Sequence, residues 1–180
     1  MCFWQASASP VLLLAAAVCC GLRLWLNMLD GMVALASGKA SRLGEIANEL
    51  PDRFSDVIVF VGIAHSGLCH PLVGYWASIM ALLTAYVGTL GQAVGVHREF
   101  AGVMSKPWRM AVVIAAAFVV AGLQWRGIPD FSERGLSVFD VACAIVIAGC
   151  VQTIVLRIVR ILAQLRDLDE VTESGPPKNS

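Results

Sequence analysis

Apolar stretches about as long as a membrane-crossing helix recur along this chain, and they constrain its fold more than any other feature. A helix needs roughly 20 apolar residues to cross about 30 Å of hydrocarbon. The stretch from about Pro10 to Leu29 meets this need, and 58% of the 180 residues are hydrophobic while only 14% are charged. The mean hydropathy of +0.74 is too high for an ordinary water-soluble domain. The sequence therefore predicts an integral membrane protein that does not bind nucleic acid, since its formal net charge is +0.

The hydropathy pattern predicts an all-α fold, a polytopic transmembrane helical bundle with about five spans. The predicted helices run from about Pro10 to Leu29, Ala40 to Leu68, Leu72 to Leu90, Met110 to Trp125 and Leu136 to Leu162. The first half of the second helix is polar, so only its later half is expected in lipid. Residues 1–165 are expected to form the transmembrane domain, and residues 166–180, rich in Glu, Ser, Pro and Gly, a disordered cytoplasmic tail.

Basic residues predict the orientation of the bundle. Most of them, such as Lys39, Arg98 and Arg157, fall on one side of the predicted spans, whereas Arg126 and Arg134 fall on the other. The positive-inside rule then predicts a multi-pass protein of the inner (cytoplasmic) membrane. The acidic segment that follows the first span faces the cytoplasm in this arrangement.

Polar side chains gather where the first predicted span ends and the second helix begins. Residues three or four apart share one face of a helix, and two such stripes are present. They consist of Arg23, Asn27 and Asp30 on the first helix and of Asn48, Asp52 and Asp56 on the second. Together the two stripes would enclose a hard divalent cation, since carboxylate and amide oxygens suit magnesium, manganese or calcium better than zinc. The alternative is a set of ordinary surface groups, with Asp30 at a helix end and the other two acids paired with Arg53 or water.

The same stretch resembles the signature of the CDP-alcohol phosphatidyltransferases, D-x2-D-G-x2-A-R-x8-G-x3-D-x3-D. The spacing agrees throughout, and five of the eight defined positions are kept, namely Asp30, Gly31, Ala34, Gly44 and Asp52. The other positions hold Asn27 and Asn48 in place of Asp and Leu35 in place of Arg. The pattern is similar to that of a bacterial subgroup of the family with Asn at these two positions.

The resemblance implies an activity in phospholipid biosynthesis. A CDP-alcohol such as CDP-diacylglycerol and an alcohol acceptor would meet at the cytoplasmic interface, and CMP would leave. The implied catalytic base is Asp52, and Mg²⁺ or Mn²⁺ would bind to Asp30, Asn27, Asn48, Asp52 and Asp56. The implied substrate-binding residues are Gly31, Ala34, Gly44, Lys106, Arg109 and Arg23. Because the two Asn side chains carry no negative charge, we expect weaker metal binding and a change from two metal ions to one.

Three basic residues have more than one interpretation. Arg23 lies inside the first span, where it would neutralise Asp30 or reach a phosphate, partly replacing the positive charge missing at Leu35. Lys106 and Arg109 are phosphate partners on the resemblance, whereas the alternative is a solvated loop that follows the positive-inside rule.

The resemblance also implies a homodimer in contact with membrane lipids and a fold of six helices, of which this sequence lacks the first. A second function class stays open. The loss of two acids and one Arg from the signature favours a catalytically impaired relative that binds nucleotide or lipid. A small transporter is less favoured, because the charges gather at one face and not near the membrane midplane.

Overall fold

The computed structural model describes residues 2–37, 42–96, 102–128 and 135–173, and these ranges are helical without any β-strand. A short 3-10 helix, η1 (Phe3–Ala8), precedes α1 (Pro10–Ser37), α2 (Arg42–Ala64), α3 (Pro71–Ala93), α4 (Lys106–Trp125) and α5 (Val138–Glu173). Side chains are not described for residues 6–8, 30–31, 33–37, 42–43, 45, 47–48 and 169–173. The predicted all-α class is confirmed.

Two helices are longer than their predicted spans. Helix α1 passes through the expected end at Asp30 and continues to Ser37. Helix α5 continues to Glu173, so the prediction of a disordered tail from residue 166 is wrong for this part of it. Residues 163–173 contain Ala163, Gln164, two Leu, Arg166 and two Glu, which are good helix formers, so the helix continues beyond the apolar stretch. Residues 174–180 of the predicted tail lie outside the described residues.

Within the described ranges, four helices are long and apolar enough to cross a membrane. These are the segments Pro10–Leu29, Pro71–Ala93, Lys106–Trp125 and Val138–Leu168. The predicted number of about five helices is confirmed, and four of the five meet the length and hydropathy of a membrane span, while α2 does not. Helix α2 carries Glu49, Asp52, Arg53 and Asp56, which lower its hydropathy, as expected for a partly polar helix. The protein is a multi-pass membrane protein with one partly polar helix.

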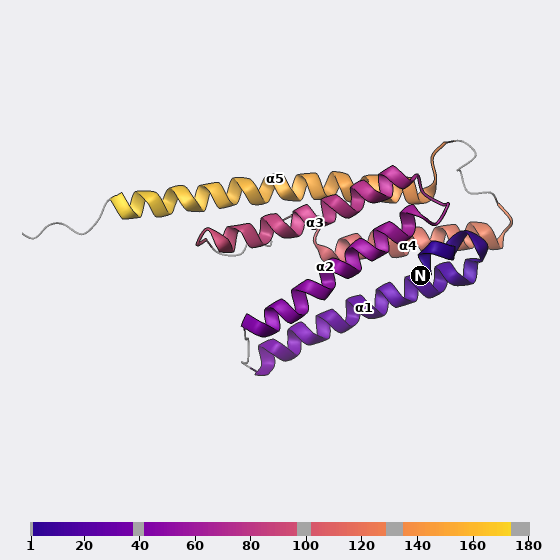
Figure 1. The fold of residues 1–180 in the computed structure, drawn as a ribbon, viewed down its shortest axis with the longest axis horizontal. Coiled ribbons are helices and arrows are strands. Elements are labelled where there is room, and N and C mark those ends of the chain that lie inside the picture. Colours follow the sequence, from indigo (N-terminus) through magenta and orange to yellow (C-terminus); the bar gives the residue numbers. More distant parts are fainter. Residues whose placement is uncertain (1, 38–41, 97–101, 129–134, 174–180) are drawn as a thin grey trace, which may run out of the picture.

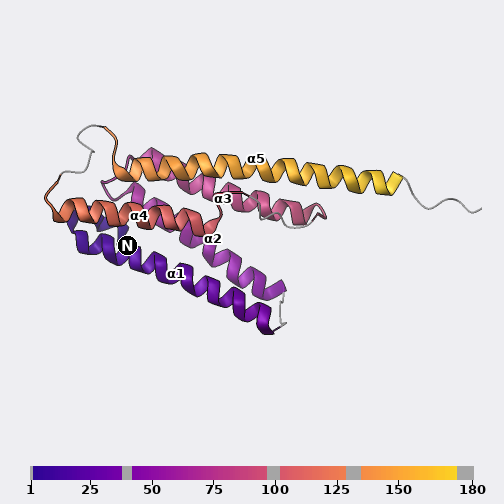
Figure 2. The same cartoon turned by 180° about the vertical axis from the view of Figure 1, so that it is seen from behind.

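The helices pack side by side in a chain of contacts that runs from α1 through α4, α5 and α3 to α2 (Figure 1). The core is built from small and branched apolar side chains, with Phe60, Val113, Val120 and Val146 fully or almost fully buried. Helices α2 and α3 approach closely at Gly74, where a Cβ atom would lie 2.7 Å from Cβ of Ala64. From behind, the C-terminal half of α1 and the N-terminal half of α2 diverge from α5 (Figure 2).

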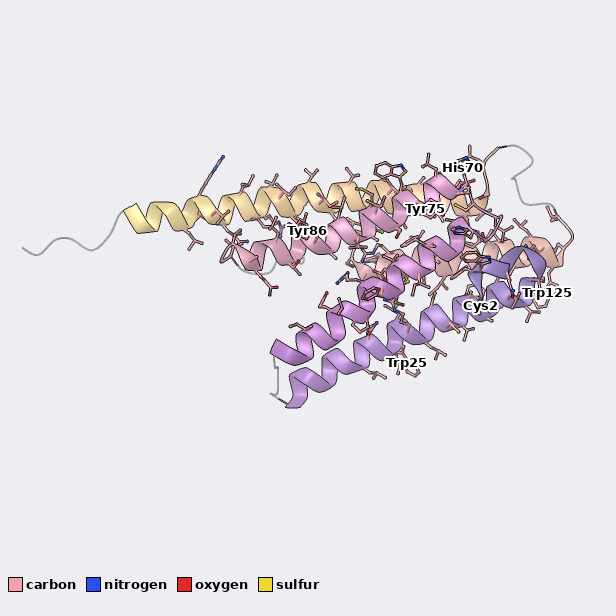
Figure 3. All side chains as sticks on the ribbon, viewed as in Figure 1. Cys2, Trp25, His70, Tyr75, Tyr86 and Trp125 are labelled. Carbon is pink, nitrogen blue, oxygen red and sulfur yellow. The ribbon has the colours of Figure 1, made fainter. Side chains whose placement is uncertain are left out.

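Large apolar side chains also cover the outside of the bundle. Trp25 on α1, Tyr86 on α3 and Trp125 at the end of α4 are 63%, 59% and 71% exposed (Figure 3). Exposed aromatic residues of this kind are common on helices that face lipid or the membrane interface. The exterior therefore suits a membrane and not water alone.

Candidate active site

Two carboxylates of α2, Asp52 and Asp56, are buried in the bundle with 8% and 3% of their surface exposed. They lie four residues apart, so both point from the same face of the helix. Ionised carboxylates are rarely buried without partners, because the loss of hydration is costly. Their partners come from α1 and α4.

The carboxylate of Asp52 accepts hydrogen bonds from three side chains. Asn27 Nδ2 donates to Oδ1 at 3.0 Å, and Arg23 Nη2 approaches the same oxygen at 3.3 Å. On its other side, Lys106 Nζ donates to Oδ2. The predicted meeting of the stripes on α1 and α2 is thus seen at Asn27 and Asp52.

Asp56 is held between two arginines. Arg23 Nη2 lies 3.0 Å from Oδ1, and Arg109 Nη2 lies 3.1 Å from Oδ2. Arg109 itself is only 2% exposed, and its Nη1 donates to the main-chain oxygen of Ala81 at 3.1 Å. Its Nε is buried without a hydrogen-bond partner. A buried guanidinium with a spare donor suits an anion that enters from the neighbouring pocket.

The segment before α4 places Lys106 and Arg109 at the site. Gly102 has a φ of +122°, and a Cβ atom there would lie 2.2 Å from Cγ2 of Thr153 on α5. The main-chain N–H of Met104 donates to Oγ1 of Thr153 at 3.1 Å. Only glycine fits so close to α5 with this backbone conformation. Thr153 therefore fixes the chain shortly before α4 begins.

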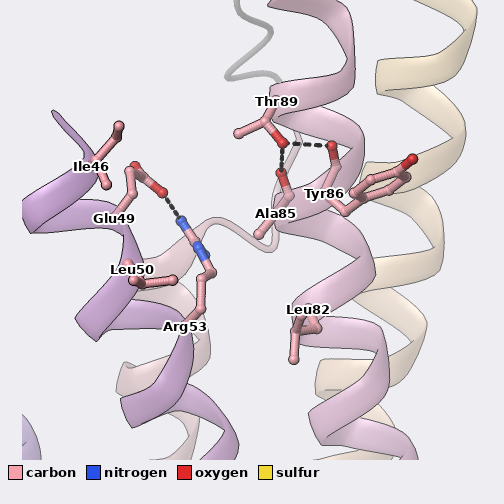
Figure 4. Close-up of a pocket in the computed structure, with 8 residues that line it drawn as sticks. All are labelled: Ile46, Glu49, Leu50, Arg53, Leu82, Ala85, Tyr86 and Thr89. Carbon is pink, nitrogen blue, oxygen red and sulfur yellow. Dashed lines mark hydrogen bonds and ion pairs between the residues drawn. The ribbon is translucent and has the colours of Figure 1, made fainter. Parts of the chain in front are cut away.

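A pocket of about 330 Å³ is lined by four basic residues and Glu49, and two of the basic residues also bind the carboxylates of Asp52 and Asp56. The four basic residues are Arg53, Lys106, Arg109 and Arg157. A second groove, of about 310 Å³, adjoins it between α2 and α3 and is lined mainly by apolar side chains such as Leu50 and Leu82 (Figure 4). Glu49 and Arg53 form an ion pair that borders both spaces. A charged pocket thus adjoins an apolar one.

Most of the predicted site residues with described side chains come together here. The group comprises Arg23, Asn27, Asp52, Asp56, Lys106 and Arg109. Gly44 is exposed in the first turn of α2. The side chains of Asp30, Gly31, Ala34 and Asn48 lie outside the described part, so their predicted roles stay predictions.

Two alternatives from the sequence are wrong. Asp52 and Asp56 do not pair with Arg53, which binds Glu49 one helical turn earlier. Lys106 does not stand in a solvated loop, since it begins α4 and binds a buried carboxylate. For Arg23, the described partners are the two acids of α2. The sequence had suggested Asp30 or a phosphate.

Two pocket residues were missed on the sequence. Arg157 is 8% exposed, and its Nη1 donates to the main-chain oxygen of Thr84 at 2.7 Å. A charged residue inside a predicted span marks a functional site by default, and this signal alone would have identified Arg157. Arg53 had been considered only as a partner for the acids.

Comparison with known proteins gives the relatives of the chain. No protein-family model matches it. The inner membrane protein YnbA of Escherichia coli is 28% identical over 126 residues, which are 68% of this chain and 63% of that protein. The phosphatidylinositol phosphate synthase of Streptomyces avermitilis is 26% identical over 155 residues, 81% of this chain and 60% of that protein. The chain is a homologue of the CDP-alcohol phosphatidyltransferases.

A solved structure confirms the fold of this phosphatidyltransferase homologue. The Mycobacterium tuberculosis phosphatidylinositol phosphate synthase, crystallised with CDP-DAG bound, superposes with a TM-score of 0.66 at 22% identity. The match covers 84% of this chain and 75% of that one. The chain spans about three fifths of the length of the curated relatives reported above. The predicted subgroup with two Asn residues stays a prediction.

Divalent-metal dependence is a general property of the CDP-alcohol phosphatidyltransferases. Each of the four carboxylate oxygens of Asp52 and Asp56 already accepts from Arg23, Asn27, Lys106 or Arg109. Among side chains with described positions, no three Asp, Glu, His or Cys residues lie close enough to hold an ion. As arranged, the described part of the predicted metal site does not fit a divalent cation.

Proposed function

We propose that this protein transfers a phosphatidyl or other phospho-alcohol group from a CDP-alcohol to an alcohol acceptor, with release of CMP. The observation that carries the proposal is the buried pair Asp52 and Asp56, bound to Lys106 and Arg109, which line a pocket with four basic residues. Acids alone would repel a pyrophosphate, and basic residues alone would bind one without activating an acceptor. Both kinds of group meet here, in a homologue of enzymes of phospholipid biosynthesis.

The charges at the site favour an anionic substrate. Arg23, Lys106 and Arg109 pair with the two carboxylates of Asp52 and Asp56, so this group of five side chains carries one positive charge in excess. Low-dielectric walls strengthen the attraction between such a pocket and phosphate oxygens. Arginine suits this task because its planar fork binds two phosphate oxygens at once.

The chemistry assigns Asp52 as the base. The acceptor oxygen attacks the phosphorus next to the alcohol of the donor, the bond from that phosphorus to CMP breaks, and the hydroxyl proton passes to the carboxylate. Asn27 and Arg23 orient this carboxylate from α1. Lys106 moves from Oδ2 to the phosphate as the substrate enters. No step is assigned to a metal ion, and Mg²⁺ or Mn²⁺ stays a prediction that rests on Asp30 and Asn48.

The apolar groove and the basic pocket suit different parts of the two substrates. The apolar groove between α2 and α3 suits an acyl chain of CDP-diacylglycerol, since Leu50, Leu82 and Tyr86 line it. The basic pocket suits an acceptor that carries a phosphate of its own, because the guanidinium groups of Arg53 and Arg157 line it together with Lys106 and Arg109. The names of the relatives point to a phosphorylated inositol. In this proposal the protein is a homodimer, and the site of each subunit faces the cytoplasm.

Release of CMP tests the proposal. The purified full-length protein is incubated in lipid micelles with CDP-diacylglycerol and inositol phosphate, glycerol phosphate or serine, with and without Mn²⁺. We expect CMP release with a phosphorylated acceptor and a loss of at least about 100-fold in Asp52→Asn, as for removal of a general base. Asp167→Asn, at an exposed position on α5, is the matched control and is expected to keep the wild-type rate.

A binding protein is the second candidate. The paired state of all four carboxylate oxygens and the changed signature positions favour it. Folded protein that binds CDP-diacylglycerol but releases no CMP with any acceptor would reject the enzyme in favour of this candidate. A full rate in Asp52→Asn would reject the assignment of the base.

A further inference from the structure

Three oxygen atoms converge on one nitrogen atom of Arg23. Its Nη2 lies 2.9 Å from the main-chain oxygen of Asp52, 3.3 Å from Oδ1 of Asp52 and 3.0 Å from Oδ1 of Asp56. Carboxylate and main-chain oxygens are the ligands that hard divalent cations take in proteins. Here a guanidinium occupies the centre of such a set.

The structure holds the Arg23 side chain in this place. It extends from the interior of an apolar helix, where an unpaired charge would be costly. Its Nη1 approaches Sδ of Met110 on α4 at 3.7 Å, and the side chain is 19% exposed. The two side chains that it bridges, Asp52 and Asp56, are more deeply buried, with only 10% and 4% of their surface exposed. Arg23 thus neutralises acids that have little access to water.

The other two basic residues do not duplicate this contact. Lys106 and Arg109 come from α4 and approach the Oδ2 atoms, one carboxylate each. Arg23 comes from α1 and approaches both Oδ1 atoms. Among the described side chains, it is the one cation that bridges the pair. Without it, the oxygens that face α1 would lose their positive partner.

We propose that Arg23 is the resident cation of Asp52 and Asp56 and excludes a divalent metal ion from them while it stays in place. A divalent ion bound to the same three oxygens would lie against the guanidinium, and repulsion at such short distances is strong. The role belongs to the acid pair itself and goes beyond the proposed transfer reaction. It predicts that removal of the Arg23 charge converts the pair into a metal site.

Binding of Mn²⁺ tests the proposal without any substrate. The affinity is measured by electron paramagnetic resonance on purified full-length protein in detergent, for wild type and Arg23→Gln. Gln keeps a hydrogen-bond donor near the acids but removes the charge. We expect Arg23→Gln to bind Mn²⁺ at least about tenfold more tightly than wild type, because a neighbouring positive charge is lost. Arg126→Gln, exposed at the opposite end of α4, is the matched control and should behave as wild type.

A second substitution locates the new site. Adding Asp56→Asn to Arg23→Gln should abolish the gain, because one of the two carboxylates is then neutral. Equal Mn²⁺ affinity of wild type and Arg23→Gln, at any level, would overturn the proposal. So would a gain that persists after Asp56→Asn.

Folding of the variant is checked by its melting temperature. In the presence of a chelator, the melting temperature of Arg23→Gln should be lower than that of wild type. Mn²⁺ should raise the melting temperature of the variant more than that of wild type. If the variant does not fold, Arg23→Lys decides. Lys keeps the charge, so affinity as low as wild type supports the proposal and a gain refutes it. Failure of CMP release would reject the proposed reaction and leave this result unchanged.

Discussion

Replacement of Arg109 by Met is expected to destabilise the protein strongly. The guanidinium is 2% exposed and binds both Asp56 and the main-chain oxygen of Ala81, each at 3.1 Å. Met is unbranched and adaptable, so it fills much of the space of the aliphatic stem. The substitution therefore removes mainly the charge and its hydrogen bonds. It leaves Asp56 with one cation in place of two.

The structure sets the size of the effect. Removal of one partner from a buried ion pair costs about 3–5 kcal/mol, because the other charge stays buried. Arg23 still binds Oδ1 of Asp56, so we expect the lower end, about 3 kcal/mol. In a double-mutant cycle with Asp56→Asn, the combined loss should fall short of the sum by about 1–3 kcal/mol, since the residues are in contact.

Reversible unfolding in mixed micelles, followed by circular dichroism, measures these free energies. Arg126→Met is the control, since this residue is exposed at the end of α4, and it should change the unfolding free energy by less than about 0.5 kcal/mol. The reasoning is refuted if Arg109→Met is as mild as the control. It is also refuted if the losses from Arg109 and Asp56 simply add.

Two further predictions concern segments outside the acid pair. Gly102→Ala should lower both the melting temperature and CMP release, because the new Cβ would meet Thr153 at 2.2 Å; Gly135→Ala, also at positive φ but with open space around it, should cost less. Equal losses in the two variants would show that the contact with α5 is unimportant. Asp140→Asn should cost about 1–2 kcal/mol, because this carboxylate accepts from the main-chain N–H groups of His70 and Ser137 at 2.7 and 3.0 Å. Hydrogen exchange at the His70 amide should become faster, and unchanged exchange would contradict the prediction.

Hydropathy predicted the helices well and their ends poorly. The third and fourth spans agree with α3 and α4 to within a few residues, because Pro71 and Pro107 lie at the first turns of these helices. Helices α1 and α5 extend beyond the ends of their apolar stretches. Hydropathy reports where lipid ends, whereas a helix ends where its backbone hydrogen bonds do.

Helical spacing predicted which site residues share one face of a helix, but not which helices meet there. The four-residue step from Asp52 to Asp56 placed both acids on one face, and the resemblance brought α1 beside them at Asn27. The partners from α4 and α5 were harder to predict, since nothing local in the sequence connects Asp56 with Arg109 or Thr84 with Arg157. Such pairs depend on how distant helices pack, and single-sequence patterns do not contain that information.

The changes from the family signature form one electrostatic pattern. Asn27 and Asn48 remove two negative charges, and Leu35 removes one positive charge. Arg23 returns a positive charge on α1, as the sequence suggested, but places it between the two carboxylates of α2. A site with fewer acids and a built-in guanidinium has less negative charge for a divalent ion to neutralise. Asn27 and Arg23 thus partner the acid pair without a metal ion, and the substitutions at Arg23 test whether the same arrangement keeps a metal ion out.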